Sequence, residues 1–308
     1  MSDFFIECKN GNLTAVKRMH ENGFNIHETI YDNMTGFDYA CSHGRLNVVE
    51  YLINYVDVNR KSRHIGGNAL FHACIHKKYD VAKFLIKNGV DIRACDNYGD
   101  NCFSIAFDND DVDMIKILHD GGINIHEVQA DNTTLLHLAC SKCKYEIVKY
   151  LVENGIDINV VDNHGRLCIH HACTRAIDDD YEQIGDKLTD REDTRTKRLQ
   201  IVKYLSEKGI NLNAYDMNGD TCLHIASWND NYEVVKYLLS CDGVNINAKA
   251  LDGLTPIEVA ASRSNTSISY QLLKKELRKR YYILYCIIQH DVFTHYIMCH
   301  DKQNNSPK

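Results

Sequence analysis

The stretch "TTLLHLACSKCKYEIVKYLVENGIDIN" spans Thr133 to Asn159 and carries the pattern that decides the fold. Its His137, Cys140 and Cys143 are spaced by three, as the ligands of a metal or the thiols of a redox pair can be. A similar sequence pattern recurs along the chain, however. Its occurrences can be aligned on a small residue at Ala40, Ala73, Ala106, Ala139, Ala172, Ala226 and Ala260. The steps are 33 residues, except for 54 at the fifth step and 34 at the last. This period predicts a stack of repeats with one insertion of 21 residues.

Each repeat contains the signals of two short helices. Stepping back 33 residues from Ala40 reaches Glu7, which aligns a degenerate first repeat. Helix-capping residues stand five positions before the aligned residue in seven of the eight repeats, namely Ser2, Thr35, Asn68, Asn101, Thr134, Thr221 and Thr255, whereas the sixth repeat has Leu167. A second stretch such as "IVKYL" at 147–151 has apolar residues at i, i+3 and i+4, which indicates a helix with one buried stripe. Glycines then end this helix, namely Gly23, Gly89, Gly122, Gly155, Gly209 and Gly243. The second repeat has "INYVDVN" there instead, so its turn must be built differently.

Helices of about ten residues are too short to be stable alone in water, so the repeats must stack into a solenoid. The motifs "TTLLHLA", "DTCLHIA" and "LTPIEVA", and the endings "ENGIDIN" and "EKGINLN", resemble ankyrin repeats over residues 2–280. The expected fold is therefore all-α, with helix-turn-helix repeats joined by short hairpins in a solenoid of about eight repeats. The units lie near 2–30, 31–63, 64–96, 97–129, 130–162, 163–216, 217–250 and 251–280. The wording, rich in Tyr, Asn and Ile, also resembles ankyrin proteins of giant DNA viruses.

Composition favours a folded protein in a reducing compartment. The chain has 308 residues, of which 44% are hydrophobic and 25% charged, and a net charge of -7 gives no general attraction for nucleic acid. It shows no signal peptide in "MSDFFIECKN" and no uninterrupted run of 18 apolar residues, so no membrane span is expected. Thirteen cysteines in this context indicate free thiols. We expect a cytoplasmic protein (host cytoplasm or nucleus if viral) with no obvious homo-oligomer.

Most cysteines and histidines occupy repeated slots and therefore indicate packing. Cysteines follow the aligned residue at Cys8, Cys41, Cys74, Cys140 and Cys173, and precede it by four at Cys102, Cys168 and Cys222. Equivalent positions on neighbouring helices are expected about 8 to 10 Å apart, too far for a disulfide. The resemblance implies that His137, His170 and His224 join neighbouring repeats by hydrogen bonds. Eight of the thirteen cysteines thus occupy these slots. Within the opening stretch, Cys143 is the one residue that the repeat does not explain, which leaves a zinc or redox role with Cys140 as a minor alternative.

No motif of a known catalytic or cofactor site occurs in the chain. We expect no enzyme activity, no cofactor and no metal. His171 is interpreted as a helix-surface residue, with a metal role as the minor alternative.

The resemblance implies that binding uses the concave face of the stack and its hairpin tips. The candidate partner-binding residues are Arg60, Lys61, Arg63, His64, Asn97, Tyr98, Asn163, His164, Tyr215 and Met217. The first four form a basic patch that could meet an acidic partner surface, or belong to an exposed loop without a partner. The predicted function is a non-catalytic scaffold for an unidentified protein partner.

Two segments lie outside the regular repeats. The insertion at 176–197 holds eight acids and four bases, and is predicted to be a solvated loop or an acidic docking arm between the two helices of its unit. Residues 281–308 begin with "YYILYCII" and are predicted to form a C-terminal capping helix and a disordered tail. Partner docking and membrane-surface contact are the alternatives for this apolar segment. A substrate adaptor for a ubiquitin ligase, using the same segment, is the alternative function.

Overall fold

The computed structural model describes residues 3–30, 33–62, 66–174, 188–263 and 267–282. Within these ranges the chain is helical, with isolated bridges at the hairpins and no strand. The described residues therefore confirm the predicted all-α repeat fold, whereas the number of eight repeats stays a prediction. The chain divides into two compact units, unit 1 over Met1–Ile125 and unit 2 over His126–Lys308.

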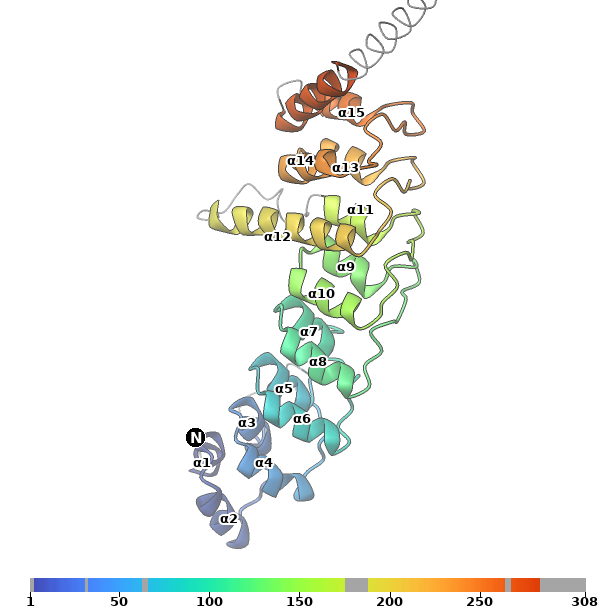
Figure 1. Ribbon diagram of the computed structural model, residues 1–308. Coiled ribbons are helices and arrows are strands. Elements are labelled where there is room, and N and C mark those ends of the chain that lie inside the picture. The colour runs from blue at the N-terminus through green and yellow to red at the C-terminus, as the bar shows by residue number, and fades with distance from the viewer. Residues whose placement is uncertain (1–2, 31–32, 63–65, 175–187, 264–266, 283–308) are drawn as a thin grey trace, which may run out of the picture. The chain divides into compact units, whose positions relative to one another are not determined.

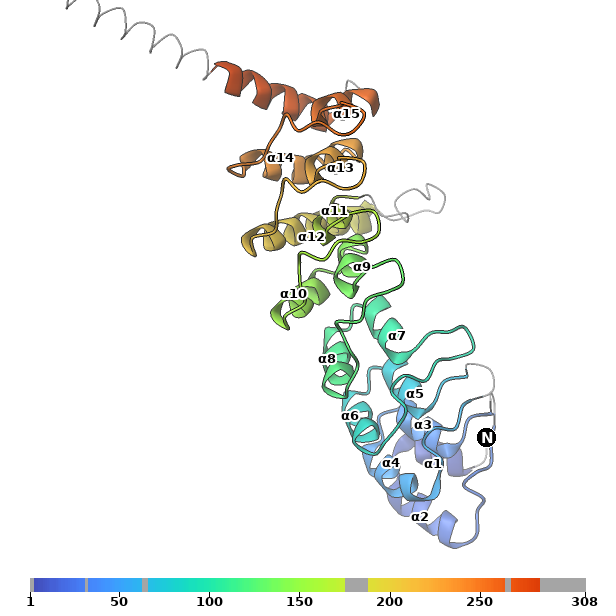
Figure 2. The ribbon, with the colours of Figure 1, turned by 90° about the vertical axis from the view of Figure 1, so that its right-hand side faces the viewer.

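Unit 1 consists of helix pairs in two stacked rows. The inner row contains α1 (Asp3–Asn10), α3 (Gly36–Ser42), α5 (Ala69–Ile75) and α7 (Cys102–Asp108). The outer row contains α2 (Leu13–Glu21), α4 (Leu46–Leu52), α6 (Tyr79–Lys87) and α8 (Val112–Asp120). Each helix packs on its partner and on the next helix of its own row. Figure 2 shows the connecting loops of unit 1 extending side by side from the inner row.

Unit 2 repeats this arrangement. Its inner helices are α9 (Leu135–Ser141), α11 (Cys168–Cys173), α13 (Cys222–Trp228) and α15 (Pro256–Arg263). Its outer helices are α10 (Tyr145–Glu153), α12 (Leu188–Glu207) and α14 (Tyr232–Ser240), and a further helix covers 268–282. Figure 1 shows the hairpins of unit 2 projecting on one side of the inner helices. The chain from 283 onward, which includes the predicted tail and most of the predicted capping helix, lies outside the described residues.

The repeat register explains the core. The seven aligned alanines are at most 2% exposed, so the aligned position belongs to the core. The apolar stripe of each outer helix is also buried, for example at Ile147, Val148 and Leu151 in α10. Side chains of Thr35, Asn68, Asn101 and Thr134 accept the free N–H groups at the start of their inner helices, as the capping pattern predicts.

The turn between the two helices of a repeat uses a left-handed residue at a fixed register position. In repeats one to five and in repeat seven this residue is Gly11, Gly44, Lys77, Asp110, Cys143 and Asp230, with φ between 50° and 79°. Cys143, which the predicted slots did not explain, is thus the turn residue of its repeat. The repeat sets its backbone conformation and leaves its side chain to vary.

Two irregularities have a local cause. The second repeat, which lacks the terminal glycine, continues α4 into the 3-10 helix η2 (Ile53–Tyr55), as the absence of that glycine required. The insertion is not a loop throughout, because its last ten residues, 188–197, form the beginning of α12. Ile201, Val202 and Leu205 of α12 are fully buried and fix this helix, and lengthening an existing helix costs far less than starting one. Residues 176–187 lie outside the described residues.

The two cysteine slots face each other across neighbouring repeats. Sulfur contacts pair Cys74 with Cys102, Cys140 with Cys168, and Cys173 with Cys222, while the thiols of Cys168 and Cys222 donate to the carbonyls of Ile158 and Leu212. All described cysteines are free thiols. The prediction that equivalent positions stay apart overlooked this contact, because it joins the end of one inner helix to the start of the next. The sulfur contact and burial raise the pKa of Cys74 well above its usual value.

Candidate interaction surface

Aspartates build the hairpin turns between repeats. Asp96, Asp162 and Asp216 each accept the backbone N–H groups two and four residues further on with Oδ1, at distances of 2.8 to 3.0 Å. One carboxylate therefore satisfies two donors that the short turn leaves without a backbone partner. In each of these turns a glycine follows the aspartate by three residues, which is the spacing Asp-x-x-Gly.

In unit 2 the tips of successive hairpins are joined through their backbones. The N–H of Asn163 donates to the carbonyl of Asp131 at 2.9 Å, that of Met217 to His164 at 2.9 Å, and that of Leu251 to Asn218 at 2.8 Å. These bonds fix each tip to the one before it. Met217 and Leu251 nevertheless remain 65% and 81% exposed. We call Asn163, His164, Tyr215, Met217 and Leu251 the tip row.

Histidines join the inner helices to the following hairpins. Nδ1 of His137 accepts the N–H of Thr134 at 3.1 Å, so the ring carries its proton on Nε2 and donates it to the carbonyl of Arg166 at 3.0 Å. His170 makes the same two bonds to Leu167 and Ala214, and His224 to Thr221 and Leu254. The predicted structural role of these three residues is confirmed. Burial lowers the pKa of His137 and His170, although the carbonyl acceptors oppose this shift.

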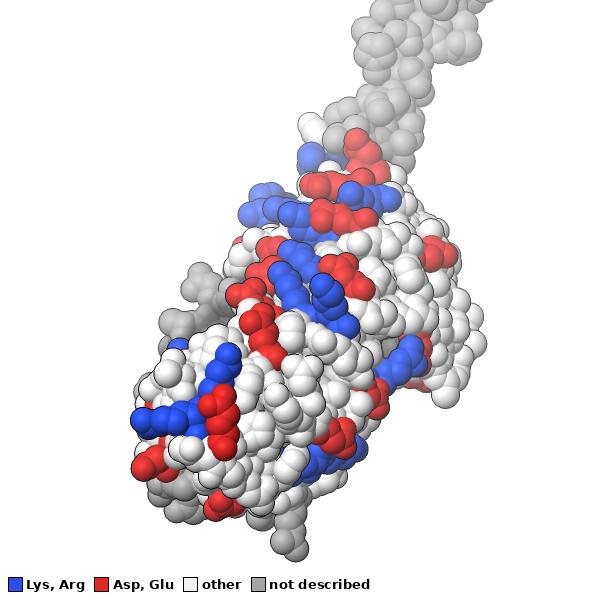
Figure 3. All heavy atoms as spheres, turned by 90° about the horizontal axis from the view of Figure 1, so that it is seen from below, with Lys and Arg blue, Asp and Glu red and all other residues white. Residues whose placement is uncertain are grey.

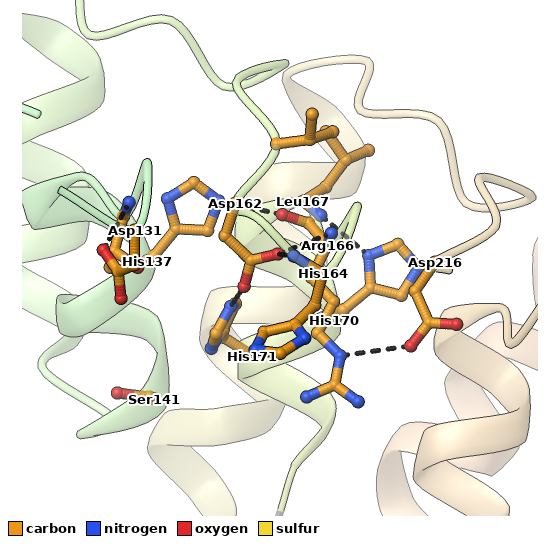
Figure 4. Close-up of polar contacts among 12 residues, drawn as sticks. Asp131, His137, Ser141, Asp162, His164, Arg166, Leu167, His170, His171 and Asp216 are labelled. Atoms are coloured by element: carbon orange, nitrogen blue, oxygen red, sulfur yellow. Dashed lines mark hydrogen bonds and ion pairs between the residues drawn. The ribbon is translucent and has the colours of Figure 1, made fainter. Parts of the chain in front are cut away.

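A charged row runs beside these histidines. Nε2 of His171 lies 2.9 Å from Asp162 Oδ2, and Nε of Arg166 donates to Asp216 Oδ2 at 3.1 Å, as Figure 4 shows. His171 is thus half-buried and hydrogen-bonded, rather than the helix-surface residue predicted, because α11 presents it to the hairpin. Burial alone would raise the pKa of Asp162, but the N–H of Arg166 and the contact with His171 outweigh it and lower that pKa.

One repeat further on, this charge pairing is absent. The position that follows the turn glycine is Arg166 in one hairpin and Asp220 in the next. Asp220 lines a groove of about 420 Å³ together with Asp252, Trp228, His224 and Arg166, which belong to three successive repeats. Trp228 is 47% exposed there. Burial raises the pKa of Asp220, and the neighbouring charges of Asp216 and Asp252 add to that shift.

The predicted basic patch of unit 1 contacts its own chain. Nη2 of Arg60 lies 2.5 Å from Asp38 Oδ2 and also donates to the carbonyl of Asn33. Nζ of Lys61 donates to the carbonyl of Cys95 at 2.8 Å. Arg63 and His64, the other two residues of the patch, lie outside the described residues. The two described cations therefore brace neighbouring hairpins of unit 1.

The other predicted residues are at hairpin tips. Asn97 and Tyr98 lie at a tip of unit 1, where Tyr98 is 85% exposed, and Tyr215 is 52% exposed in unit 2. The structure brings Asn163, His164, Tyr215 and Met217 into the tip row. Sequence reasoning missed Leu251 and Asp252, whose hairpin begins with Ala250 in place of the aspartate, although "LDG" at 251–253 keeps the register of the turn.

Three further kinds of site can be checked in the described part of the chain: a basic surface, a membrane-spanning helix and a metal site. On the face in Figure 3, acidic and basic side chains are interspersed, with no continuous basic area among the residues shown in colour. No described helix is long and apolar enough to cross a membrane. Within the same residues, no three His, Cys, Asp or Glu side chains converge in a way that could hold a metal ion.

A family model described as ankyrin repeats (3 copies) matches residues 4–96, 102–184 and 194–250, which is well over half of the chain. The protein belongs to the ankyrin-repeat family. Ankyrin repeats are in general modules of protein–protein interaction, and proteins built from them are typically non-catalytic. No curated protein matches the sequence, so the likeness to viral ankyrin proteins still rests on composition alone.

Proposed function

We propose that this protein is a non-catalytic scaffold that binds another protein through the tip row and the adjoining inner-helix side of unit 2. The observation that carries the proposal is the chain of backbone hydrogen bonds between successive tips, which holds Met217 and Leu251 in place while leaving them exposed. A backbone that is already fixed loses little conformational entropy on binding, so more of the contact energy contributes to affinity.

Affinity capture from the native cell tests this proposal. We expect the paired substitution Met217→Glu and Leu251→Glu to abolish capture of the partner, because both side chains lie at exposed tips and the charge would be buried in the complex. Ile268→Glu is the matched control, since Ile268 is 51% exposed but lies on the helix 268–282 outside the tip row. Unchanged capture by the paired variant would contradict the proposal.

The same capture separates the remaining alternatives. Lys61→Glu with Arg63→Glu tests the basic patch of unit 1 while leaving the ion pair of Arg60 with Asp38 intact. The ubiquitin-ligase adaptor predicts a cullin-associated partner that is lost on deletion of residues 281–308. We propose a cytoplasmic location, or a nuclear one if the protein is viral, which fluorescence microscopy of the tagged protein in its own cell would test.

A further inference from the structure

The groove of unit 2 joins two acidic side chains to an exposed aromatic ring. Asp220 is half-buried and Asp252 is exposed, and both line the 420 Å³ groove beside Trp228. Arg166 also lines the groove but is paired with Asp216, which leaves Asp220 and Asp252 as the acidic lining residues. The groove thus offers carboxylates for a cation and a ring face for its apolar or delocalised part.

Comparison with the preceding repeat shows which charged group is replaced in this groove. In the preceding hairpin, Arg166 reaches Asp216 at the next tip and joins the two hairpins by an ion pair. Asp220 occupies the same position one repeat later, where an acidic side chain meets the acidic tip residue Asp252. An external guanidinium or ammonium group placed between them would supply the charge that Arg166 supplies one repeat earlier.

We propose that this groove binds an arginine or lysine side chain presented by an extended, basic segment of the partner protein. The cation lies between Asp220 and Asp252 and against Trp228, while the neighbouring residues of the segment contact Met217 and Leu251 at the tips. The inference rests on the proposed function, because it names the chemistry of the partner that the tip row would bind.

Trp228 is the chain's one tryptophan and therefore reports on the groove directly. The probe is a blocked peptide of alternating glycine and arginine, and the control peptide carries citrulline, which keeps the shape of arginine without its charge. Titration of the full-length protein with the arginine peptide should change the Trp228 fluorescence saturably. The citrulline peptide should leave it unchanged.

Variants then separate the groove from general attraction to an acidic protein. Loss of two charge-assisted contacts in Asp220→Asn with Asp252→Asn should weaken binding of the arginine peptide by about tenfold or more. Asp242→Asn, a change of an exposed acid outside this groove, should leave the affinity unchanged. Circular dichroism verifies that each variant is folded.

Two results would overturn the inference: no saturable response to the arginine peptide, or equal binding by the groove variant and the parent. If either occurs while capture of the partner still depends on Met217 and Leu251, the scaffold function stands and only the proposed partner chemistry is wrong. If capture is independent of these tips, the scaffold proposal fails whatever the peptide does.

Discussion

At the scale of the single residue, the repeats are held together by side chains that serve two neighbours at once. His137 accepts the N–H that begins its own helix and donates to the carbonyl of Arg166 in the next hairpin. Protonation of Nδ1 would convert this acceptor into a donor that faces the N–H of Thr134. It would also place a charge in a buried site. The residue works only in its neutral form.

The stability of the fold should therefore fall in mild acid. The pKa of His137 and of His170 is lowered from 6.5 in the folded chain, so as the pH falls the unfolded chain takes up protons first. Stability is complete above about pH 6.5 and decreases below it, by about 1.4 kcal/mol for each unit by which a pKa is lowered. Urea unfolding at pH 7.5 and pH 5.5 measures this loss.

Substitution identifies the histidine responsible. His137→Gln should cost about 1–3 kcal/mol at pH 7.5 through lost hydrogen bonds, and should reduce the difference between the two pH values. His27→Gln, at an exposed position, is the control and should change neither. An unchanged pH dependence in His137→Gln would show that other groups carry the acid sensitivity.

Cys143 gives a prediction about backbone conformation. Its φ is 54°, a conformation that costs a side-chain-bearing residue roughly 1–2 kcal/mol, and the same turn position holds Gly11 and Gly44 in the first two repeats. Cys143→Gly should unfold within about 1 kcal/mol of the parent, because relief at the backbone offsets the lost burial of the thiol. Cys143→Val should lose about 2 kcal/mol or more in urea unfolding. Equal stabilities would mean that the backbone conformation does not limit this turn.

At the scale of the element, each outer helix depends on how it ends. After α10, Gly155 has φ 81° and donates its N–H to the carbonyl of Val152, and Ile156 donates to Leu151. These bonds use carbonyl groups that the last turn of the helix leaves free. A Cβ at Gly155 would meet no atom within 4 Å, so a substitution there changes the backbone preference alone.

Gly155 should accordingly distinguish side chains by their tolerance of the left-handed region. Gly155→Val should destabilise unit 2 by about 1–2 kcal/mol, and Gly155→Asn by clearly less, since Asn adopts this conformation more readily. Trp228 fluorescence during denaturation measures both. If the two variants unfolded alike, steric or solvent effects rather than φ would govern the end of α10.

At the scale of the whole molecule, the contacts divide the chain into two units, and each has its own hydrophobic core. Compact units of this kind can unfold separately, since a repeat contacts mainly its neighbours. Two probes can detect separate unfolding. Trp228 fluorescence reports on unit 2, whereas circular dichroism reports on the helices of both units.

A matched pair of core substitutions tests this division. Leu85 in α6 and Leu238 in α14 occupy the same repeat position and are both fully buried. Each change to Ala should cost about 2–5 kcal/mol. Leu238→Ala should lower the urea midpoint seen by Trp228, whereas Leu85→Ala should lower only part of the circular dichroism transition. A shift of the Trp228 midpoint by Leu85→Ala would show that the units unfold as one.

Sequence periodicity predicted the caps and the buried stripes of the outer helices, because each depends on slots whose chemistry recurs. The histidine bonds were implied by the resemblance to ankyrin repeats. Periodicity did not predict the turn role of Cys143, since there the repeat fixes a dihedral angle and not a side chain. The helix at 188–197 was missed because its stability comes from the packed half of α12. The groove was missed for a further reason: Arg166, Asp220 and Asp252 come from three repeats, and their proximity follows only from the stacked hairpins.

The facing thiols of neighbouring repeats can report how often the junction between those repeats opens. Burial and sulfur contact raise the pKa of Cys74, Cys140 and Cys222, so a closed interface holds its thiols in the unreactive protonated form. An alkylating reagent can therefore modify them only while the interface is briefly open. The pairs lie at separate junctions. Mass spectrometry that follows the order in which the thiols are alkylated would therefore rank the junctions by how often each one opens.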